Sequence, residues 1–391
     1  MKKYLIRLGE ISLKGLNRTY FQARLCNNIK EKLLPHHVKI QSQKGRLFLY
    51  TEDDVPHDLV FKVLNTTFGL DGYSECHSTE DKTLDGLFAL VDKVISDNFD
   101  DGITTFKVDA RREDKRFPLS SYQIECQIGG KILEKYPKLK VDVKKPERVL
   151  YVEIRKDIFV YSSRIKGRRG LPVGTAGKGL SLLSGGIDSP VSSYLIASRG
   201  VKLELLYFHA YPYTTDEAKE KVITLARTIA PYLQGTVLHI VSFTELEKVI
   251  AKNGYENEKT LMLRAGMVKA AEKLAKIRRC ECIVTGEALS QVASQTLKAL
   301  DFTSSLTTYN ILRPLVGLDK AEIIERAKEI GTYETSILPY ADCCVLFSPK
   351  HPKTKPQKDK LTKGYEALNL DDVIEKAVNE REVVYIKPEC C

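Results

Sequence analysis

The pattern of hydrophobic and polar positions changes once along the chain. Up to about residue 160, short alternating segments are interleaved with stretches of helical period, as in the strand expected at 150–154 and the helix expected at 120–136. From Leu180 onward, near-continuous apolar runs alternate with helices. Alternation is typical of strands with one solvated face, and continuous runs are typical of parallel strands covered on both faces. The pattern therefore predicts small α+β units followed by an α/β domain with a doubly wound parallel sheet.

Three domains are predicted from this change and from a glycine-rich segment at residues 167–179. The expected boundaries are 1–75 for an α+β sandwich, 76–170 for a second α+β unit, and 176–391 for the α/β domain. A chain of 391 residues fits two or three domains of ordinary size.

The α/β domain has five apolar runs that we interpret as its strands. They are residues 180–183, 202–210, 236–243, 280–288 and 311–316. Open α/β sheets bind ligands at the carboxyl ends of their strands, so we expect the functional residues in the loops that follow these runs.

The loop after the first run reads SGGIDSP over residues 184–190. Its glycines let the backbone approach a phosphate, and we expect Ser189 and Pro190 to begin the next helix as its cap and first residue. There is no GK[ST] sequence, so a Walker-type loop is not predicted. The alternative is a glycine-rich turn without a ligand.

Lys320 is a second candidate for anion binding. Asp319 and Glu322 predict a capped helix with this lysine in its first turn. A cation is unfavourable there unless an anion lies opposite it. The alternative is a solvated surface lysine.

The net charge of +10 is concentrated in one segment. Residues 101–180 contain 19 Lys and Arg against 10 Asp and Glu, a net charge of +9. Such a segment is typical of proteins that bind a polyanion, although a solvated basic face would give the same count. The candidate phosphate contacts are Arg111, Arg112, Lys115, Arg116, Arg168 and Arg169.

The nine cysteines and the absence of a long apolar stretch predict a soluble, cytoplasmic protein with reduced thiols. Cys26, Cys76 and Cys126 lie in apolar patterns and are expected to be buried. Cys280 and Cys282 are too closely spaced to predict a metal site, and we expect no metal ligands among the cysteines.

Three blocks of sequence resemble the tRNA 4-thiouridine synthetases, also called tRNA sulfurtransferases. The blocks are residues 106–121 (FKVDARREDKRFPLSS), residues 152–172 ending in GRRGLP, and the LLSGGIDSP loop that continues into YFHAYP. The last resembles the PP-loop of ATP pyrophosphatases. The first two resemble a THUMP RNA-binding module, which in this family follows a ferredoxin-like domain. The chain resembles the short family members, which lack a rhodanese domain.

The resemblance implies a site that binds ATP and Mg²⁺. The implied ATP residues are Leu182, Leu183, Ser184, Gly185, Gly186, Asp188, Ser189, Tyr207, Phe208, Arg264, Gly286 and Gln295. Asp188 is expected to help hold Mg²⁺ or the pyrophosphate, and Lys320 to stabilise charge on the phosphates.

The implied reaction is the adenylation of O4 of the uridine at tRNA position 8, followed by its replacement with sulfur. Many members also supply sulfur for the thiazole of thiamine. The sulfur-handling segment of the family corresponds to Cys343 and Cys344, of which Cys344 is our choice. The expected partners are tRNA and a cysteine desulfurase or another persulfide donor, and a role for Cys390 and Cys391 stays open.

Two other functions remain open at this point. One is a different adenylating PP-loop enzyme that modifies tRNA, and the other is a tRNA-binding protein without catalysis. The sequence also leaves the oligomeric state open, a homodimer included.

Overall fold

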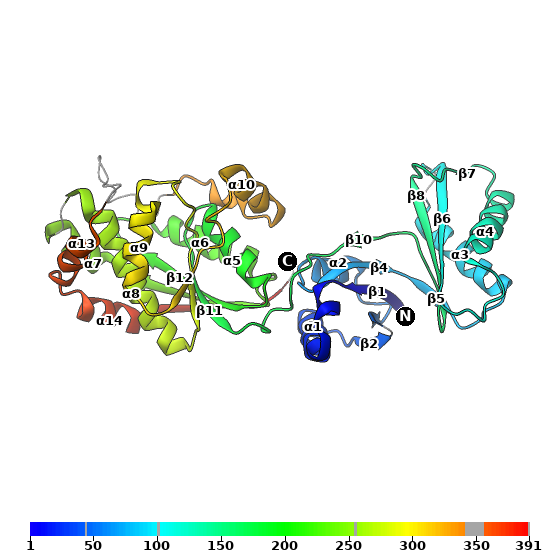
Figure 1. Ribbon diagram of the computed structural model, residues 1–391, viewed down its shortest axis with the longest axis horizontal. Helices are drawn as coiled ribbons and strands as arrows, with labels where there is room; N and C mark the ends of the chain where they lie inside the picture. The colour runs from blue at the N-terminus through cyan, green and yellow to red at the C-terminus, as the bar shows by residue number, and fades with distance from the viewer. Residues whose placement is uncertain (44, 100–101, 254–255, 341–355, 390–391) are drawn as a thin grey trace. The chain divides into compact units, whose positions relative to one another are not determined.

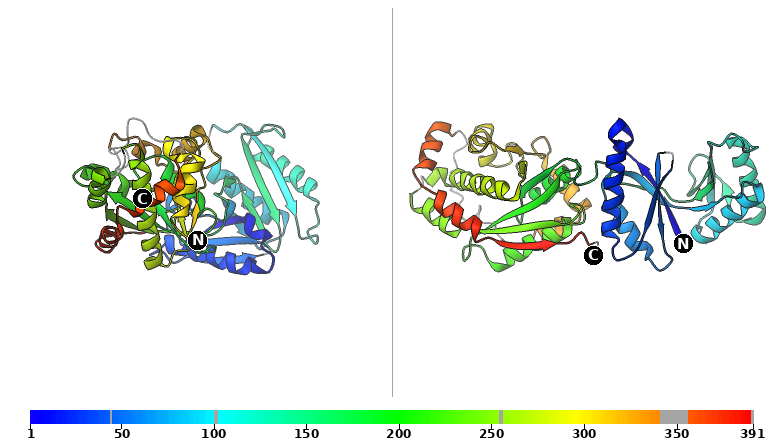
Figure 2. Two further views of the ribbon diagram at one scale, coloured as in Figure 1. Left: turned by 60° about the vertical axis from the view of Figure 1, so that its left-hand side comes forward. Right: turned by 90° about the horizontal axis from the view of Figure 1, so that it is seen from below.

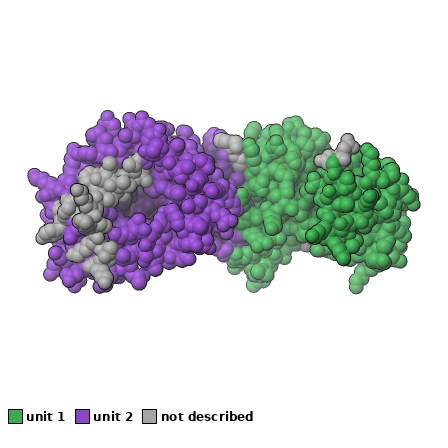
Figure 3. Space-filling view, turned by 90° about the horizontal axis from the view of Figure 1, so that it is seen from above, with its two compact units in different colours: residues 1–19, 29–65, 69–169 green, residues 20–28, 66–68, 170–391 purple. Residues whose placement is uncertain are grey.

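The computed structural model describes residues 1–43, 45–99, 102–253, 256–340 and 356–389. Its packing divides the chain into two compact units (Figure 3). Unit 1 consists of residues 1–19, 29–65 and 69–169, and unit 2 consists of residues 20–28, 66–68 and 170–391. The boundary after Arg169 lies inside the glycine-rich segment. The finer division into three domains remains a prediction.

Unit 1 contains an antiparallel sheet that includes the first strand of the chain (Figure 1). In spatial order its strands are β10 (Ile165–Lys166), β4 (Leu70–Glu75), β1 (Lys2–Leu8), β3 (Arg46–Thr51) and β2 (Lys39–Gln43). The helices of this part of the chain are α1 (Arg18–Lys32) and α2 (His57–Asn65). This antiparallel sheet with its helices is the α+β arrangement that the sequence predicts for the start of the chain.

The second sheet of unit 1 is covered by two helices. Its strands, in spatial order, are β5 (His77–Thr79), β9 (Ile158–Tyr161), β8 (Arg148–Ile154), β6 (Thr105–Arg112) and β7 (Lys140–Val141). The helices are α3 (Leu84–Asn98) and α4 (Ser121–Lys135). A capping box between Ser120 and Gln123 starts α4, whose residues Ile124, Ile128 and Ile132 are buried in the core. The helix expected at residues 120–136 is therefore present.

The two sheets of unit 1 share a small core and a buried ionic network. Phe48 of β3 stacks on Phe159 of β9, with ring centroids 4.8 Å apart. Beside them, Arg46 donates to the carboxylate of Glu153, which also accepts hydrogen bonds from Arg155 and Tyr161.

Unit 2 contains the doubly wound sheet that the apolar runs predict. Its strands, in spatial order, are β15 (Asn310–Leu312), β14 (Cys282–Val284), β11 (Lys178–Leu182), β12 (Lys202–His209), β13 (Thr236–Ser242) and β16 (Glu382–Ile386). The first five are parallel, as expected, and β16 is an antiparallel edge strand. The order reverses direction at β11, which places a crevice at its carboxyl end.

Helices cover both faces of this sheet (Figure 2). One face is covered by α5 (Asp188–Ala197), α6 (Asp216–Ile229) and α10 (Lys320–Glu329), with α11 (Tyr333–Ser336) beside α6. The other is covered by α7 (Thr244–Asn253), α8 (Lys259–Arg278), α9 (Leu297–Ser305), α13 (Lys358–Glu366) and α14 (Asp371–Asn379). Leu205 and Tyr207 of β12 belong to the first core, and Leu206 and Phe208 to the second. Burial on both faces explains the continuous apolar run.

A cluster of charged groups surrounds the buried Glu204 in the amino-terminal half of β12. Glu204 accepts hydrogen bonds from Nε and Nη2 of Arg278, both 2.8 Å long, and lies 2.7 Å from Lys178 Nζ. Nε2 of the fully buried His239 donates to it at 2.8 Å, and Arg381 donates to His239 Nδ1. Burial alone would raise the pKa of Glu204, but Arg278, His239 and Lys178 hold it far below its usual value.

Among the described residues, no helix combines the length and the apolar character that crossing a membrane requires.

Candidate active site

The SGGIDS loop connects β11 to α5 and is held together by its own serines. Ser189 Oγ accepts a hydrogen bond of 2.8 Å from the Ser184 N–H, and Ser184 Oγ accepts one of 3.3 Å from the Gly186 N–H. The expected helix start at Ser189 is wrong, because α5 begins at Asp188 and is capped by no side chain in the described part of the chain. Ser189 instead folds back onto the loop. The N–H groups of the first turn of α5 therefore remain available for an anion.

Asp188 connects this loop to two distant parts of unit 2. Its Oδ1 accepts from Lys320 Nζ at 2.6 Å, and its Oδ2 accepts from Gln291 Nε2 at 3.0 Å. Lys320 is the first residue of α10, whose capping box of Asp319 and Glu322 is present as predicted. The structure therefore brings the two candidate anion-binding elements of the sequence together.

A cavity of about 490 Å³ opens beside the loop, at the carboxyl ends of the strands. Eleven of the twelve residues expected at an ATP site line it, and only Gly185 does not. Phe208 and Leu182 supply apolar walls, and Arg264 of α8 supplies a cation. A concave apolar pocket with a few convergent polar groups is typical of a small-molecule site.

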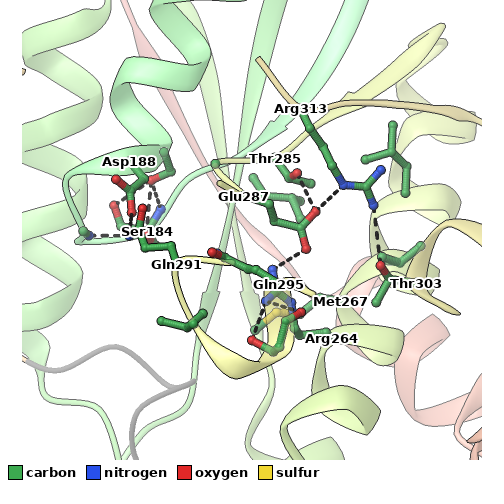
Figure 4. Close-up of a pocket in the computed structure, with 18 of the residues that line it drawn as sticks. Ser184, Asp188, Arg264, Met267, Thr285, Glu287, Gln291, Gln295, Thr303 and Arg313 are labelled. Carbon is green, nitrogen blue, oxygen red and sulfur yellow. Dashed lines mark hydrogen bonds and ion pairs between the residues drawn. The ribbon is translucent and has the colours of Figure 1, made fainter. Parts of the chain in front are cut away.

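Three charged side chains form the inner wall of the cavity (Figure 4). Glu287, which is 5% exposed, forms a close ion pair with Arg264 and accepts from Arg313 Nε at 2.6 Å. Thr285 Oγ1 also donates to it, at 2.9 Å. Burial opposes ionisation, but the two arginines lower the pKa of Glu287. Because two guanidinium groups share one carboxylate, this wall carries one excess positive charge toward the cavity.

Glu287 and Arg313 were not among the residues expected from the sequence. Both follow strands of the sheet, Glu287 after β14 and Arg313 directly after β15. Position at a carboxyl strand end was the available signal, but each residue alone reads as an ordinary surface charge.

Gly286 and Gln295 line the cavity for different reasons. A Cβ atom on Gly286 would lie 2.8 Å from the backbone N and Cα of Ser189, so only glycine lets this strand end approach α5. Gln295 Oε1 is buried and accepts no hydrogen bond from the residues that the structure describes. A buried acceptor that faces a cavity is satisfied when a ligand donates to it, as an adenine amino group or a ribose hydroxyl does.

The six candidate phosphate contacts lie in unit 1, and most already have protein partners. Arg112 donates to the carbonyl oxygens of Phe117 and Leu119, and Arg168 donates to that of Asn65. Three others lie near carboxylates, in the pairs Arg111 with Asp109, Arg116 with Asp114, and Arg169 with Asp71. For Lys115 no ion pair is found among the described residues.

The three buried cysteines are poorly suited to sulfur chemistry. Burial raises the pKa of Cys76 to about 12 and that of Cys280 to about 11, and it raises that of Cys282 as well. A protonated thiol is a weak nucleophile. Cys126 is exposed, contrary to expectation, and Cys26 is half-buried. Cys343, Cys344, Cys390 and Cys391 lie outside the described residues.

No group of three or more His, Cys, Asp or Glu side chains that could hold a metal ion is found within the described ranges.

Three family models match the chain. The model described as "Thiamine biosynthesis protein (ThiI)" matches residues 174–370, the THUMP domain matches residues 81–162, and the ThiI ferredoxin-like domain matches residues 3–74. The fold class that the sequence predicts is therefore confirmed.

Curated relatives match over nearly the whole length. A protein of Agathobacter rectalis named "Probable tRNA sulfurtransferase" is 41% identical, with 99% of this chain and 100% of the relative covered. One of Acetivibrio thermocellus with the same name is 42% identical, with 99% of each chain covered.

A solved structure of a 4-thiouridine synthetase in complex with RNA and bound ATP has a similar fold. It is 36% identical in sequence, with a TM-score of 0.89, and the match covers 99% of this chain and 100% of that one.

Proposed function

Because the chain belongs to the ThiI family of tRNA sulfurtransferases, we propose that it uses ATP to convert a uridine of tRNA into 4-thiouridine, at position 8. The observation that carries the proposal is the cavity beside the SGGIDS loop, which joins an anion-binding helix end, two arginines and an apolar wall. The relatives and the ATP-bound neighbour support the same reaction.

The first step is adenylation of the uridine. ATP lies with its phosphates at the loop and the N-terminus of α5, and its base against the apolar wall near Phe208. Uridine O4 attacks the α-phosphorus, and the bond to pyrophosphate breaks. Lys320 and the loop N–H groups stabilise the negative charge on the departing pyrophosphate. The target base leaves its stack to reach this cavity, as bases do in other modifying enzymes.

Asp188 is the residue that would hold Mg²⁺. Mg²⁺ binds one or two carboxylates together with substrate phosphates, so a single aspartate at a phosphate loop suffices. Its chemistry is to neutralise the triphosphate and the leaving pyrophosphate. The ion pair between Asp188 and Lys320 shows that this carboxylate is positioned beside a cation that could bind the same phosphates.

The second step delivers sulfur. A sulfide ion, or the terminal sulfur of a persulfide on Cys343 or Cys344, attacks C4, and the C4–O4 bond breaks to release AMP. With a persulfide, a second thiol then breaks the S–S bond, and an external thiol reduces the disulfide that forms. The high pKa values of the buried cysteines support assignment of this step to other thiols. A cysteine desulfurase or a comparable donor supplies the persulfide in the cytoplasm.

One assay tests the proposal. The protein is incubated with unmodified tRNA, ATP, Mg²⁺ and sulfide, and the products are analysed for 4-thiouridine absorbance, AMP and pyrophosphate. We expect all three, in equal amounts. Release of ADP and phosphate would contradict the reaction, and AMP with a different modified base would indicate another adenylating tRNA enzyme. Binding of tRNA without AMP would indicate a non-catalytic RNA-binding protein.

A further inference from the structure

Adenylation of O4 removes a proton from the uridine. In uridine, C4 is doubly bonded to O4, and N3 carries a hydrogen. When O4 bonds to the α-phosphorus, the electrons of the N3–H bond form a double bond between N3 and C4, so a nearby group must take the N3 proton. The carboxylates among the described residues that line the cavity are Asp188 and Glu287, and both are held by cationic side chains. An acceptor without such a partner fits this step better.

A histidine lies at the carboxyl end of β12, directly after two residues that line the cavity. The alternation of the strand places the side chain of His209 on the same face of the sheet as Tyr207 and opposite Phe208. The ring centroids of His209 and Tyr207 are 6.0 Å apart. The other histidine that the structure describes in unit 2, His239, belongs to the cluster around Glu204. His209 is therefore the described imidazole closest to the proposed chemistry.

The two faces of the sheet differ at the carboxyl ends of β11 and β12. On one face, Phe208 and the cavity-lining residues of α8, Arg264 among them, form the wall assigned to the ATP base. On the face that carries His209 lie the starts of α5 and α6 and the short helix α11. Ser336 of α11 donates to the carbonyl oxygen of Gly186 in the SGGIDS loop at 3.3 Å. A uridine that reaches the loop from this second face meets the α-phosphate without displacing the adenine.

Hydrogen bonds fix both the backbone around His209 and the position of the proton on its ring. Nε2 lies 3.4 Å from the carbonyl oxygen of Thr215, and because a carbonyl oxygen can only accept, Nε2 carries the hydrogen. In the neutral ring Nδ1 is then the acceptor, and it makes no hydrogen bond with any residue that the structure describes. The carbonyl oxygen of His209 accepts from the Phe243 N–H at 2.8 Å, and Thr214 Oγ1 accepts from the Ala210 N–H at 2.9 Å. The ring nitrogen that can take a proton is therefore carried by an anchored segment.

Tyr211 continues this row of rings into solvent. Its side chain is 60% exposed, and its ring centroid lies 6.5 Å from that of His209. Thr244 Oγ1 donates to the carbonyl oxygen of Tyr211 at 2.7 Å, which holds the exposed residue in place. Bases that leave a nucleic-acid stack are commonly received by aromatic side chains. The rings from Tyr211 to Tyr207 therefore mark a path by which a flipped base reaches the cavity past His209.

We propose that His209 is the general base that takes the N3 proton of the uridine during adenylation. This inference rests on the proposed function, because the proton is lost only when O4 is adenylated. The proton moves from N3 to Nδ1 as the bond between O4 and the α-phosphorus forms and the bond to pyrophosphate breaks. The imidazolium later returns the proton to N3 when the sulfur that replaces AMP carries none, and to solvent otherwise.

The first test replaces His209 with glutamine in the full-length protein. The amide of His209→Gln can still donate to the carbonyl oxygen of Thr215, but it cannot take a proton. We expect single-turnover release of pyrophosphate, at saturating ATP and unmodified tRNA, to fall by about 10²-fold or more. The Kd values of ATP and tRNA should stay close to those of the wild type. The matched control is His37→Ala, which removes an exposed histidine of unit 1 and should leave the rate unchanged.

A second substrate separates a chemical role of His209 from a structural one. Fluorine at C5 withdraws electrons and makes the N3–H of uridine more acidic, so that less help from a base is needed. We expect the rate loss of His209→Gln to be smaller by about tenfold on a tRNA with 5-fluorouridine at position 8 than on unmodified tRNA. Both tRNAs are assayed with the same protein preparation, so a misfolded fraction cancels from the comparison.

Two results would overturn the role of His209. One is a wild-type rate of pyrophosphate release in His209→Gln. The other is an equal loss on the two tRNAs, which would assign the side chain a structural function. Formation of 4-thiouridine by the wild type is measured in parallel. Its absence would overturn the proposed function, whereas its presence together with either of these two results would overturn the role of His209 alone.

Discussion

Two buried glutamates of unit 2 have similar partners and different surroundings. Glu204, on β12, and Glu287, after β14, are each 5% exposed, and each lies between two cationic side chains. Lys178 and Arg278 beside Glu204 are partly exposed at the amino-terminal end of the strands and do not line the cavity, whereas Arg264 and Arg313 beside Glu287 do. Similar ion pairs therefore stabilise the amino-terminal end of the parallel strands and orient ligand-facing arginines at their carboxyl end. A buried ion pair becomes informative about function when one partner also faces a cavity.

Asp188 lies at the carboxyl end of the strands and lines the cavity, and its replacement should have the largest effect on activity. Asp188→Ala removes the carboxylate that positions Lys320 and would hold Mg²⁺, so we expect pyrophosphate release to fall by about 10³-fold, ~4 kcal/mol in the transition state. The matched control is Glu375→Ala, which breaks the exposed pair with Lys273 and should leave the rate unchanged. Retention of full activity by Asp188→Ala would remove Asp188 from the active site.

Glu204→Gln should affect stability without affecting ligand binding. The amide leaves Arg278, Lys178 and His239 without their shared anion, and breaking a buried pair costs about 3–5 kcal/mol. We expect this loss in the free energy of unfolding measured with urea. ATP should still raise the Tm of the variant, because the cluster around Glu204 contributes no residue to the cavity wall. Loss of the ATP-induced Tm shift would mean that the Glu204 cluster and the ATP cavity are energetically coupled.

Glu287→Gln, unlike Glu204→Gln, should weaken the binding of ATP. Arg264 and Arg313 lose the carboxylate that orients them, so we expect the ATP Kd to rise about tenfold, or ~1.4 kcal/mol, and the ATP-induced Tm shift to shrink. Calorimetric titration with ATP measures the first, and thermal unfolding with and without ATP measures the second. Glu287→Asp, which keeps the charge, should recover part of the affinity. An equal loss in Glu287→Asp and Glu287→Gln, or unchanged ATP binding in both, would assign Glu287 a purely structural role.

The smallest expected effect is on the pH dependence of stability. The folded pKa of Glu204 lies below its unfolded value of about 4.3, so its stabilising contribution is complete above that pH and is lost as the pH falls toward the folded pKa. Between pH 5 and 3, we expect the unfolding free energy of the wild type to fall more steeply than that of Glu204→Gln, by up to ~1.4 kcal/mol per pH unit. Parallel curves from urea titrations at each pH would contradict this.

The sequence predicts the strands and helices better than it predicts the contacts between their side chains. The apolar runs identify the parallel strands, and the cap at Asp319 identifies Lys320 as a lysine in an unfavourable position. Glu287 and Arg313 were missed because their pairing joins positions 26 residues apart and leaves no local signal. Ser189 was misplaced because its local preference for a helix cap is overridden by hydrogen bonds to the loop. Arg112 shows the same limit, since charge counting cannot tell a phosphate contact from a side chain that binds carbonyl groups.

The antiparallel strand β16 has a consequence for the synthesis of the protein. β13 is an edge strand until β16 pairs with it, yet their facing residues, such as Thr236 and Ile386, are separated by 150 positions. At about 5–20 residues per second, a ribosome needs roughly 8 to 30 seconds to make the intervening chain. During this interval the hydrogen-bonding groups of β13 remain open to other nascent chains, which is a recognised route to aggregation. Residues 382–386 therefore determine when unit 2 is complete, and their loss should reduce the soluble yield even though they lie outside the cavity.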